Sequence, residues 1–467
     1  MNDPAFWHRL QFAFTITYHY LFPQVTMGLA WFLVFWKCLA LRTGGGRYAE
    51  AARFWARVFG LTFAVGVVTG IPMEFQFGTN WASFSKYAGG VVGQTLAMEG
   101  MFAFLLESAF VGALVWGEKR LGPRKHLLAA VGVALGSWLS GYFIVVTNAF
   151  MQHPTGYTSA ADGSLGIGNM REYLLNDWAL IQFVHNQAAA LVTGTFAVCA
   201  VGAFYALRGV HADQSRLYLR HGVAAGTVAS VLVAFPTGDA QAKIVARYQG
   251  PTLAAMEGRF ETAPMAEITL IGQPNVRERR LDNPIKVPGM LSFLAYGTFH
   301  SDVRGLNDFA PDTWPTNIEL LYYSFHVMAG LGTMFIALMA LSVVQILRGR
   351  LDRSRSLLWT LMLAFPFPFI ANTAGWITTE LGRQPWLVYG LFRTSDGFSD
   401  AVSSGDVLFT LIGLTGLYFV LGLLYLYLVG REVLHGPGFA EARVDHARAE
   451  AGRIQPSGTT GSEIARG

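Results

Sequence analysis

Residues 320–347, LLYYSFHVMAGLGTMFIALMALSVVQIL, decide the fold, because this long run contains no Asp, Glu, Lys or Arg. A helix needs about 20 mostly apolar residues to cross ~30 Å of hydrocarbon. Similar stretches recur along the 467 residues, of which 52% are hydrophobic and only 14% charged. Soluble domains average about 25% charged residues. The sequence therefore predicts an all-α integral membrane protein folded as one helical bundle.

Nine segments satisfy the length criterion for a membrane span. They lie at about 12–41, 54–75, 95–117, 127–150, 178–207, 221–236, 315–347, 357–379 and 405–430. The shortest of them is the sixth. We therefore expect transmembrane helices 1–6 within 1–236, a long loop at 237–314, helices 7–9 within 315–430 and a polar, disordered tail at 431–467.

Basic residues alternate between the connectors and predict the orientation of the chain. They gather in the odd connectors, at Arg42, Arg47, Arg53 and Arg57, at Lys119, Arg120, Arg124 and Lys125, at Arg208, Arg216 and Arg220, and at Arg348, Arg350, Arg353 and Arg355. Cytoplasmic connectors carry an excess of Lys and Arg. The N-terminus is therefore expected outside and the C-terminus in the cytoplasm. The loop at 237–314 is then external, and long ordered loops are usually functional.

Polar and metal-binding side chains gather at one depth of the spans, towards the outer face. They are His19, Glu74, Glu99, Glu107, His185, His326, Met328 and Glu380. Ionisable groups at such depth are costly and are functional candidates by default, although any one of them could simply be satisfied by a neighbouring helix. Together they suit tetrapyrroles, since a His/Met pair makes a six-coordinate haem and a single ligand leaves a position for oxygen. His326 and Met328 lie about 200° apart on their helix, so only one of them can face a haem.

A haem-free, proton-coupled secondary transporter is the alternative function. Transporters of that kind carry inverted repeats, whereas nine spans divide poorly into two halves and the chain has no internal repeat. The chain also lacks the GxxxxGK[ST] loop of nucleotide-driven transport and the CxxCH motif of covalent haem attachment. The sequence therefore favours non-covalent haem over either kind of transporter.

Six ordered blocks of sequence carry a family resemblance. They are RLQFAFTITYHYLFPQVTMG (9–28), GIPMEFQFGTNW (70–81), AMEGMFAFLLESAFVG (97–112), QFVHNQAAALVTG (182–194), YYSFHVMAGLGTMF (322–335) and TTELGRQPW (378–386). In this order they resemble subunit I of the cytochrome bd quinol oxidases over most of the chain. The last block is the most specific, because GRQPW with a preceding glutamate is a hallmark of that family.

The resemblance implies three haems. A low-spin haem b would be held by His185 and Met328, a high-spin haem b by Glu380, and haem d, or a third haem b, by His19 with Glu99 opposite. Glu74, Trp376 and Arg383 would belong to these cofactor sites. Glu107, Ser108 and Ser140 resemble the family's proton path, and Asp239 is a further candidate for it.

The loop at 237–314 resembles the short form of the family's quinol-oxidising Q-loop. Glu257 in LAAMEG matches its acidic residue. The family commonly has a lysine where this chain has Thr252, so Lys243 or Arg247 is expected to substitute in quinol binding. The family also usually has arginine where this chain has His326, and we therefore expect the potential of the low-spin haem to depend on pH.

The implied activity is that of a respiratory terminal oxidase in the bacterial inner membrane. Quinol, either ubiquinol or menaquinol, would be oxidised at the outer face. O₂ would be reduced to water with cytoplasmic protons, which generates a proton-motive force without pumping. The resemblance implies a second membrane subunit (subunit II) and a small single-span subunit as partners, besides the lipid bilayer, and no nucleic acid.

Overall fold

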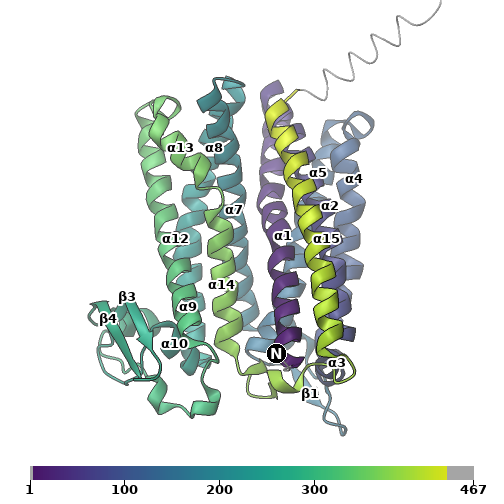
Figure 1. The fold of residues 1–467 in the computed structure, drawn as a ribbon. Coiled ribbons are helices and arrows are strands. Elements are labelled where there is room, and N and C mark those ends of the chain that lie inside the picture. The colour runs from purple at the N-terminus through teal and green to yellow at the C-terminus, as the bar shows by residue number, and fades with distance from the viewer. Residues whose placement is uncertain (1–3, 439–467) are drawn as a thin grey trace, which may run out of the picture.

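Nine membrane-spanning helices dominate the part of the chain that the computed structural model describes, residues 4–438 (Figure 1). In chain order the spans are α1 (Pro4–Thr43), α2 (Gly46–Thr79), α3 with η1 and α4 (Ala82–Met98, Glu99–Phe104 and Leu105–Trp116), α5 (Glu118–Gln152), α7 (Asp177–Arg208), α8 with α9 (Ala212–Ala234 and Thr237–Tyr248), α12 (Ile318–Leu347), α13 with α14 (Arg355–Leu363 and Phe367–Arg383) and α15 (Ser404–His435). The predicted all-α architecture and the number of spans are confirmed.

Short elements join these helices. They are β1 (Tyr157–Ser159), β2 (Leu165–Ile167), α6 (Met170–Leu174), α10 (Gly250–Met256), β3 (Ile268–Asn275), β4 (Arg280–Val287), α11 (Met290–Tyr296), η2 (Leu306–Asp308), η3 (Pro311–Thr313), η4 (Leu351–Arg353), β5 (Trp386–Val388), β6 (Phe392–Arg393) and η5 (Thr394–Asp396). Within residues 4–438 the strands pair as three antiparallel hairpins, β1–β2, β3–β4 and β5–β6.

Most of the helices are longer than the hydropathy pattern predicts, although the seventh begins at Ile318 rather than at 315. The sixth span, expected at 221–236, begins at Ala212 with α8 and continues as α9 to Tyr248, so the first part of the predicted loop is helical. The difference arises because hydropathy detects the apolar middle of a helix, whereas the backbone hydrogen bonds continue into polar residues at both ends. The predicted tail at 431–467 lies mainly outside the described residues, except that α15 continues to His435.

The long connector between the sixth and seventh spans forms a separate layer at one end of the bundle. We call residues 249–317 the hairpin lobe. It contains α10, β3, β4 and α11 and packs against α9 and α12. The N-terminus lies at the same end of the bundle as this lobe, while α15 finishes at the opposite end (Figure 1).

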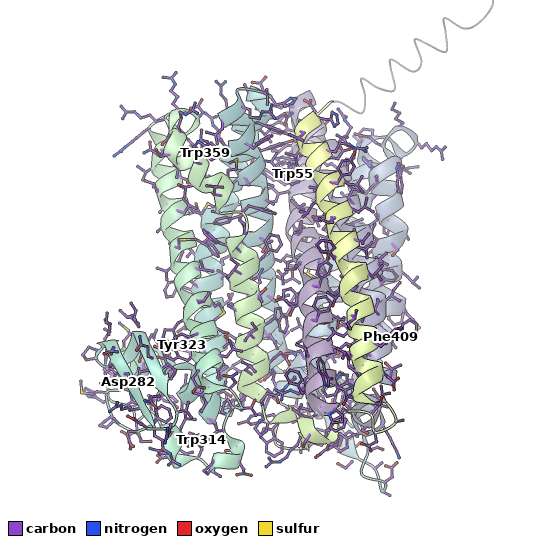
Figure 2. The ribbon with its side chains drawn as sticks, viewed as in Figure 1. Trp55, Asp282, Trp314, Tyr323, Trp359 and Phe409 are labelled. Atoms are coloured by element: carbon purple, nitrogen blue, oxygen red, sulfur yellow. The ribbon has the colours of Figure 1, made fainter. Side chains whose placement is uncertain are left out.

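The outer surface of the bundle is apolar along the spans, as expected of helices that face lipid. Phe409 of α15 is 78% exposed and Trp359 of α13 is 47% exposed, and both point away from the bundle (Figure 2). Within the bundle, α1 crosses α7 at Gly28, where an added Cβ would lie 2.2 Å from the carbonyl oxygen of Ala190. Small residues allow this close approach, which fixes α1 against α7 beside the cavity described next.

Candidate functional site

A cavity of about 950 Å³ lies among α1, α2, η1, α5 and α14. Its lining includes eight of the predicted site residues, namely His19, Glu74, Glu99, Glu107, Ser140, Trp376, Glu380 and Arg383. The remaining lining is largely apolar and aromatic. A large apolar pocket with a few convergent polar groups is typical of a ligand or cofactor site, and its volume is near the upper end of the usual ~300–1,000 Å³.

His19 is oriented by a threonine of the neighbouring helix. Its Nδ1 lies 3.2 Å from the hydroxyl oxygen of Thr69, and that hydroxyl donates its own hydrogen to the carbonyl of Val65 or Gly66. The threonine oxygen must therefore accept from Nδ1–H, which leaves the Nε2 lone pair of His19 available for iron. Gly70 lies against the ring, where an added Cβ would come within 2.9 Å of His19 Cε1.

His185 of α7 is held in the same way, although it lies outside the lining of the cavity. Its Nδ1 is 3.1 Å from the hydroxyl oxygen of Thr237, which donates to the carbonyl of Leu232 at 2.7 Å. His185 thus also carries its proton on Nδ1 and presents Nε2. Second-shell hydrogen bonds of this kind fix the tautomer and ring orientation of metal-ligating histidines.

Met328 and His326 leave α12 on different sides, as their angular separation predicts. The sulfur of Met328 faces α14, where an added Cβ at Gly375 would lie 2.9 Å from it. His326 faces the hairpin lobe instead, with Nε2 at 2.9 Å from the carbonyl oxygen of Thr269 and Nδ1 at 2.9 Å from that of Tyr322. Of this pair, Met328 is the residue directed towards the interior of the bundle.

Glu380 is fixed at the end of α14 by two donors. Asn148 donates to one carboxylate oxygen at 2.7 Å, and Arg383 donates to the other through a very short contact. Asn148 in turn accepts from the Gln182 amide at 2.9 Å. A carboxylate has about four acceptor positions, so Glu380 retains capacity to bind iron.

Arg383 has donors that the described residues do not satisfy. Only 3% of the residue is exposed, and neither Nε nor Nη1 has a hydrogen-bond partner among residues 4–438. A buried donor left without a partner costs about 1–3 kcal/mol, and more when charged. Because Arg383 lines the cavity, its free N–H groups suit an anionic group bound there, such as a haem propionate.

Glu99 and Glu107 also meet at this cavity. Glu99 begins η1, a π-helix that no sequence pattern indicated; π-turns occur frequently at functional sites. Its carboxylate accepts from the Ser140 hydroxyl at 2.6 Å. Glu107 is buried on α4. The hydroxyl of Ser108 is buried without a partner among the described residues and does not line the cavity.

Glu257 occupies the interior of the hairpin lobe. It is 3% exposed, and its carboxylate accepts from the backbone N–H of Thr269 at 3.3 Å. Burial raises the pKa of Glu257 to about 7. Thr269 also accepts from His326 through its carbonyl, so one residue of β3 links Glu257 to α12.

Thr252 connects the hairpin lobe to α14. Its hydroxyl donates to the carbonyl of Gly382 at 2.7 Å, within the GRQPW block. The contact is tight, because an added Cβ at Gly382 would lie 2.4 Å from Thr252 Cγ2. The residue that replaces the family's lysine is therefore buried and points towards the helix that carries Glu380.

The three charged candidates on α9 lie outside the lining of the cavity. Lys243 forms an ion pair with Asp239 at 2.5 Å, so these two charges compensate each other. The guanidinium of Arg247 lies over the ring of Tyr248, 5.0 Å from its centroid.

Four residues of the site escaped sequence reasoning. Asn148 and Gln182 are polar side chains in apolar spans, which is a readable signal, but an amide carries no charge and stands out less than a carboxylate. Thr69 and Thr237 gave no signal, because threonines commonly bond to their own helix. Only the fold shows that these two hydroxyls meet histidines.

Comparisons with family models, curated proteins and solved structures all identify bd oxidases as similar to this chain. The family model described as cytochrome bd terminal oxidase subunit I matches residues 7–437. The chain is 32% identical to cytochrome bd-II ubiquinol oxidase subunit 1 of Escherichia coli, over 92% of this chain and 96% of that protein. It is 34% identical to cytochrome bd ubiquinol oxidase subunit 1 of Bacillus subtilis, over 92% of this chain and 93% of that protein. The bd oxidase structure from Geobacillus thermodenitrificans superposes with a TM-score of 0.87 at 30% identity, covering 94% of this chain and 100% of that one.

Proposed function

The chain belongs to the cytochrome bd terminal oxidase subunit I family, and from this premise we propose that its cavity and its hairpin lobe divide the reaction between them. Membership makes the protein an oxidoreductase of the quinol oxidase class, a terminal oxidase for which haem is expected. Nine apolar helices and the family together indicate a multi-pass protein of the bacterial inner membrane, and the family implies a partner subunit II. The transporter alternative loses its support.

We assign three haem positions to this chain. His19 would hold haem d, or a third haem b, and Glu380 would hold the high-spin haem b. His185 and Met328 would hold the low-spin haem b. The bound haems would carry electrons from quinol to oxygen. The observation that supports the assignment most is the orientation of both histidines, each with Nδ1–H bonded to a threonine and Nε2 free.

The basic connectors support an orientation with the hairpin lobe outside and the end of α15 in the cytoplasm. Quinol, as ubiquinol or menaquinol, would dock at the hairpin lobe. Glu257 would accept a proton during oxidation, since a pKa near the working pH suits a general base, and burial brings its pKa to about 7. Thr252 would position this base relative to α14, and Lys243 and Arg247 would act from the exposed side of α9.

Glu107 and Glu99 would deliver cytoplasmic protons to the cavity, with Ser140 bridging towards Glu99. Ser108, next to Glu107 on α4, is a further candidate for this route. Asp239 is paired with Lys243 on α9 beside the hairpin lobe, so it would act, as a proton-carrying group, at the outer end only. Each charge that crosses the membrane stores about 2.3 kcal/mol per 100 mV. A proton-motive force would thus form without pumping, because quinol oxidation releases its protons at the outer face whereas oxygen reduction takes its protons from the cytoplasm.

The test is a quinol-dependent oxygen-consumption assay of the purified complex together with its reduced-minus-oxidised absorption spectrum. We expect turnover and the bands of haem b, with a red band if haem d occupies the His19 position. A colourless complex, or haem bands without quinol-dependent oxygen uptake, contradicts the proposal. The second outcome would leave the haem sites standing and reject the quinol site alone.

A further inference from the structure

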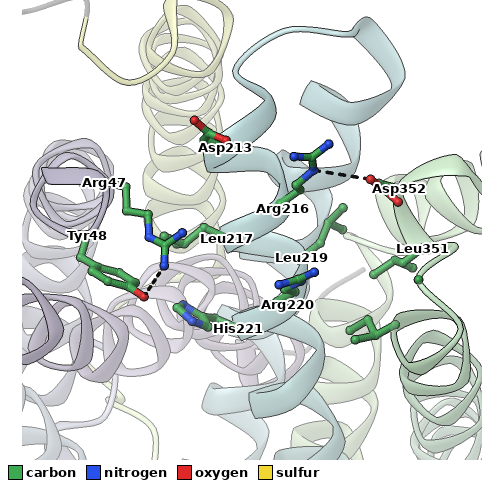
Figure 3. Close-up of a pocket in the computed structure, with 12 residues that line it drawn as sticks. Arg47, Tyr48, Asp213, Arg216, Leu217, Leu219, Arg220, His221, Leu351 and Asp352 are labelled. Carbon is green, nitrogen blue, oxygen red and sulfur yellow. Dashed lines mark hydrogen bonds and ion pairs between the residues drawn. The ribbon is translucent and has the colours of Figure 1, made fainter. Parts of the chain in front are cut away.

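A second cavity, of about 510 Å³, lies where α8 begins and α12 ends, at the end of the bundle opposite the hairpin lobe (Figure 1). Figure 3 shows the residues that line it. It is bordered by the start of α2, the first turns of α8 and the connector that follows α12. Its polar lining consists of Arg47, Tyr48, Asp213, Arg216, Arg220, His221 and Asp352. None of these residues belongs to the haem or quinol sites proposed above.

We propose that this cavity binds the phosphate headgroup of an anionic phospholipid from the membrane leaflet at this end of the bundle. Basic pockets between transmembrane helices are suited to such headgroups. The proposal does not depend on the assigned haem or quinol sites, because it rests only on the charges, the donors and the apolar borders of this one cavity.

The cavity carries more positive charge than its own residues neutralise. Arg216 lies 3.5 Å from the carboxylate of Asp352. Arg47 donates instead to the uncharged hydroxyl of Tyr48 at 2.8 Å. Within residues 4–438, the side chain of Arg220 forms no hydrogen bond or ion pair. Among the same residues, Asp213 forms no ion pair with Arg47, Arg216 or Arg220. Three arginines thus face two carboxylates, which leaves a net positive charge for one anion.

His221 adds a hydrogen-bond donor beside these arginines. The indole N–H of Trp36 donates to Nδ1 of His221 at 2.8 Å. Because an indole can only donate, Nδ1 carries no hydrogen, and the neutral ring therefore bears its hydrogen on Nε2. Arg47 of α2 and Arg220 of α8 line the same cavity as this histidine. In Figure 3, Arg47 lies on the α2 side of His221, and Arg216 and Arg220 lie towards Asp352.

Exposed apolar side chains adjoin the lining residues of the cavity, which favours a lipid over free phosphate. Phe35 of α1 is 46% exposed, and its ring lies 5.2 Å from that of His221. Leu347, at the end of α12 and two residues before Gly349 of the lining, is 80% exposed. Acyl chains below a bound headgroup would cover these side chains, whereas an inorganic anion would leave them bare.

The test compares spin-labelled phosphatidylglycerol with spin-labelled phosphatidylcholine on the complete oxidase complex in phosphatidylcholine vesicles. We expect Arg220→Gln and Arg47→Gln each to lower the preference for phosphatidylglycerol about fivefold, since a basic residue near the membrane surface contributes about 1 kcal/mol. Arg220→Lys keeps the charge and should retain most of the preference, which separates loss of charge from misfolding. Arg124→Gln, an exposed change outside the cavity, is the control for the general attraction of basic residues to anionic lipid and should lower the preference less than either cavity variant.

Two outcomes overturn the proposal. If Arg220→Gln and Arg47→Gln keep the wild-type preference, or lose no more than Arg124→Gln, the cavity does not select anionic lipid. If inorganic phosphate added to the vesicles displaces the labelled phosphatidylglycerol from the wild type, and does not do so in Arg220→Gln, the ligand is free phosphate and the lipid assignment fails.

Discussion

The cavity among α1, α2, α5 and α14 and the hairpin lobe hold the functional groups assigned to them in different ways. In the cavity, Arg383 keeps two N–H groups without a partner among the described residues, and His19 keeps Nε2 free. In the lobe, Glu257 and Thr252 are bonded to backbone groups of neighbouring segments. Unsatisfied donors indicate a ligand that the polypeptide does not supply. Hydrogen-bonded groups such as Glu257 and Thr252 need no bound ligand as a partner. Their environment is determined by the polypeptide, which through burial raises the pKa of Glu257.

The largest effect is expected from Glu107→Gln, which tests whether the cavity depends on proton delivery. Positioned acid–base groups contribute about 10²–10⁴-fold, so we expect oxygen consumption to fall at least ~100-fold while the haem content stays unchanged. Charge movement in proteoliposomes should fall in parallel. Glu319→Gln, an exposed change at the start of α12, is the control. Full turnover with full charge movement in Glu107→Gln would remove this residue from the proton route.

Glu257 is expected to make quinol oxidation at the hairpin lobe depend on pH. A base must be ionised to accept a proton, and burial raises the pKa of Glu257 to about 7. We therefore expect kcat/KM for quinol to rise about tenfold per pH unit below 7 and to level off above it. The raised pKa acts on stability in the opposite sense, because the folded state holds a proton that the unfolded state releases at its ordinary value, so folding stability falls as the pH rises towards 7.

Glu257→Gln should abolish the pH-dependent limb that this carboxyl produces and lower the plateau of kcat/KM. A wild-type profile that is flat between pH 5 and 8 while Glu257→Gln remains fully active would show that another group accepts the proton. The haem spectrum of the variant serves as the check that the cavity is intact, since Glu257 does not line it.

A smaller effect is expected from Thr252→Val, which breaks the hydrogen bond between the lobe and α14. A hydrogen bond of this kind contributes about 1 kcal/mol, so we expect KM for quinol to rise about fivefold with little change in kcat. Thr252→Ser keeps the hydroxyl and should remain close to the wild type. An unchanged KM in the valine variant would mean that the lobe is positioned without this contact.

The smallest effect is expected from His326, whose side chain faces the hairpin lobe, whereas that of Met328 faces α14. We expect the midpoint potential of the low-spin haem to vary between pH 5 and 8 by less than the ~59 mV per pH unit of a fully coupled one-electron, one-proton step. His326→Arg should remove this variation. Redox titration at several pH values measures the midpoint potential in the wild type and in His326→Arg. Identical pH dependence in the two proteins would disprove the effect of His326 on the haem potential.

The sequence predicted the architecture well because the free energy of transferring each side chain into lipid depends on that residue alone. These free energies can be summed along the chain. Breaks such as η1 and the α8–α9 junction were missed, since hydropathy does not report the pattern of backbone hydrogen bonds. The cavity was anticipated through residues such as Glu99 and Glu380, whose charge makes them conspicuous in a span. The partners that orient the site residues, such as Asn148 for Glu380 and Thr69 for His19, depend on which helices pack together, and one sequence does not reveal that.

The central claim is that His19 and His185, each oriented by a threonine through Nδ1–H, hold haem. A haem inventory of the purified complex tests it most directly. Pigment analysis and reduced-minus-oxidised spectra would be compared for the wild type, His19→Ala and His185→Ala, with His300→Ala as an exposed control. The account predicts that His19→Ala loses the oxygen-site haem and keeps the low-spin haem b, and that His185→Ala loses the low-spin haem b. A full haem complement in both variants, with wild-type spectra, would contradict it.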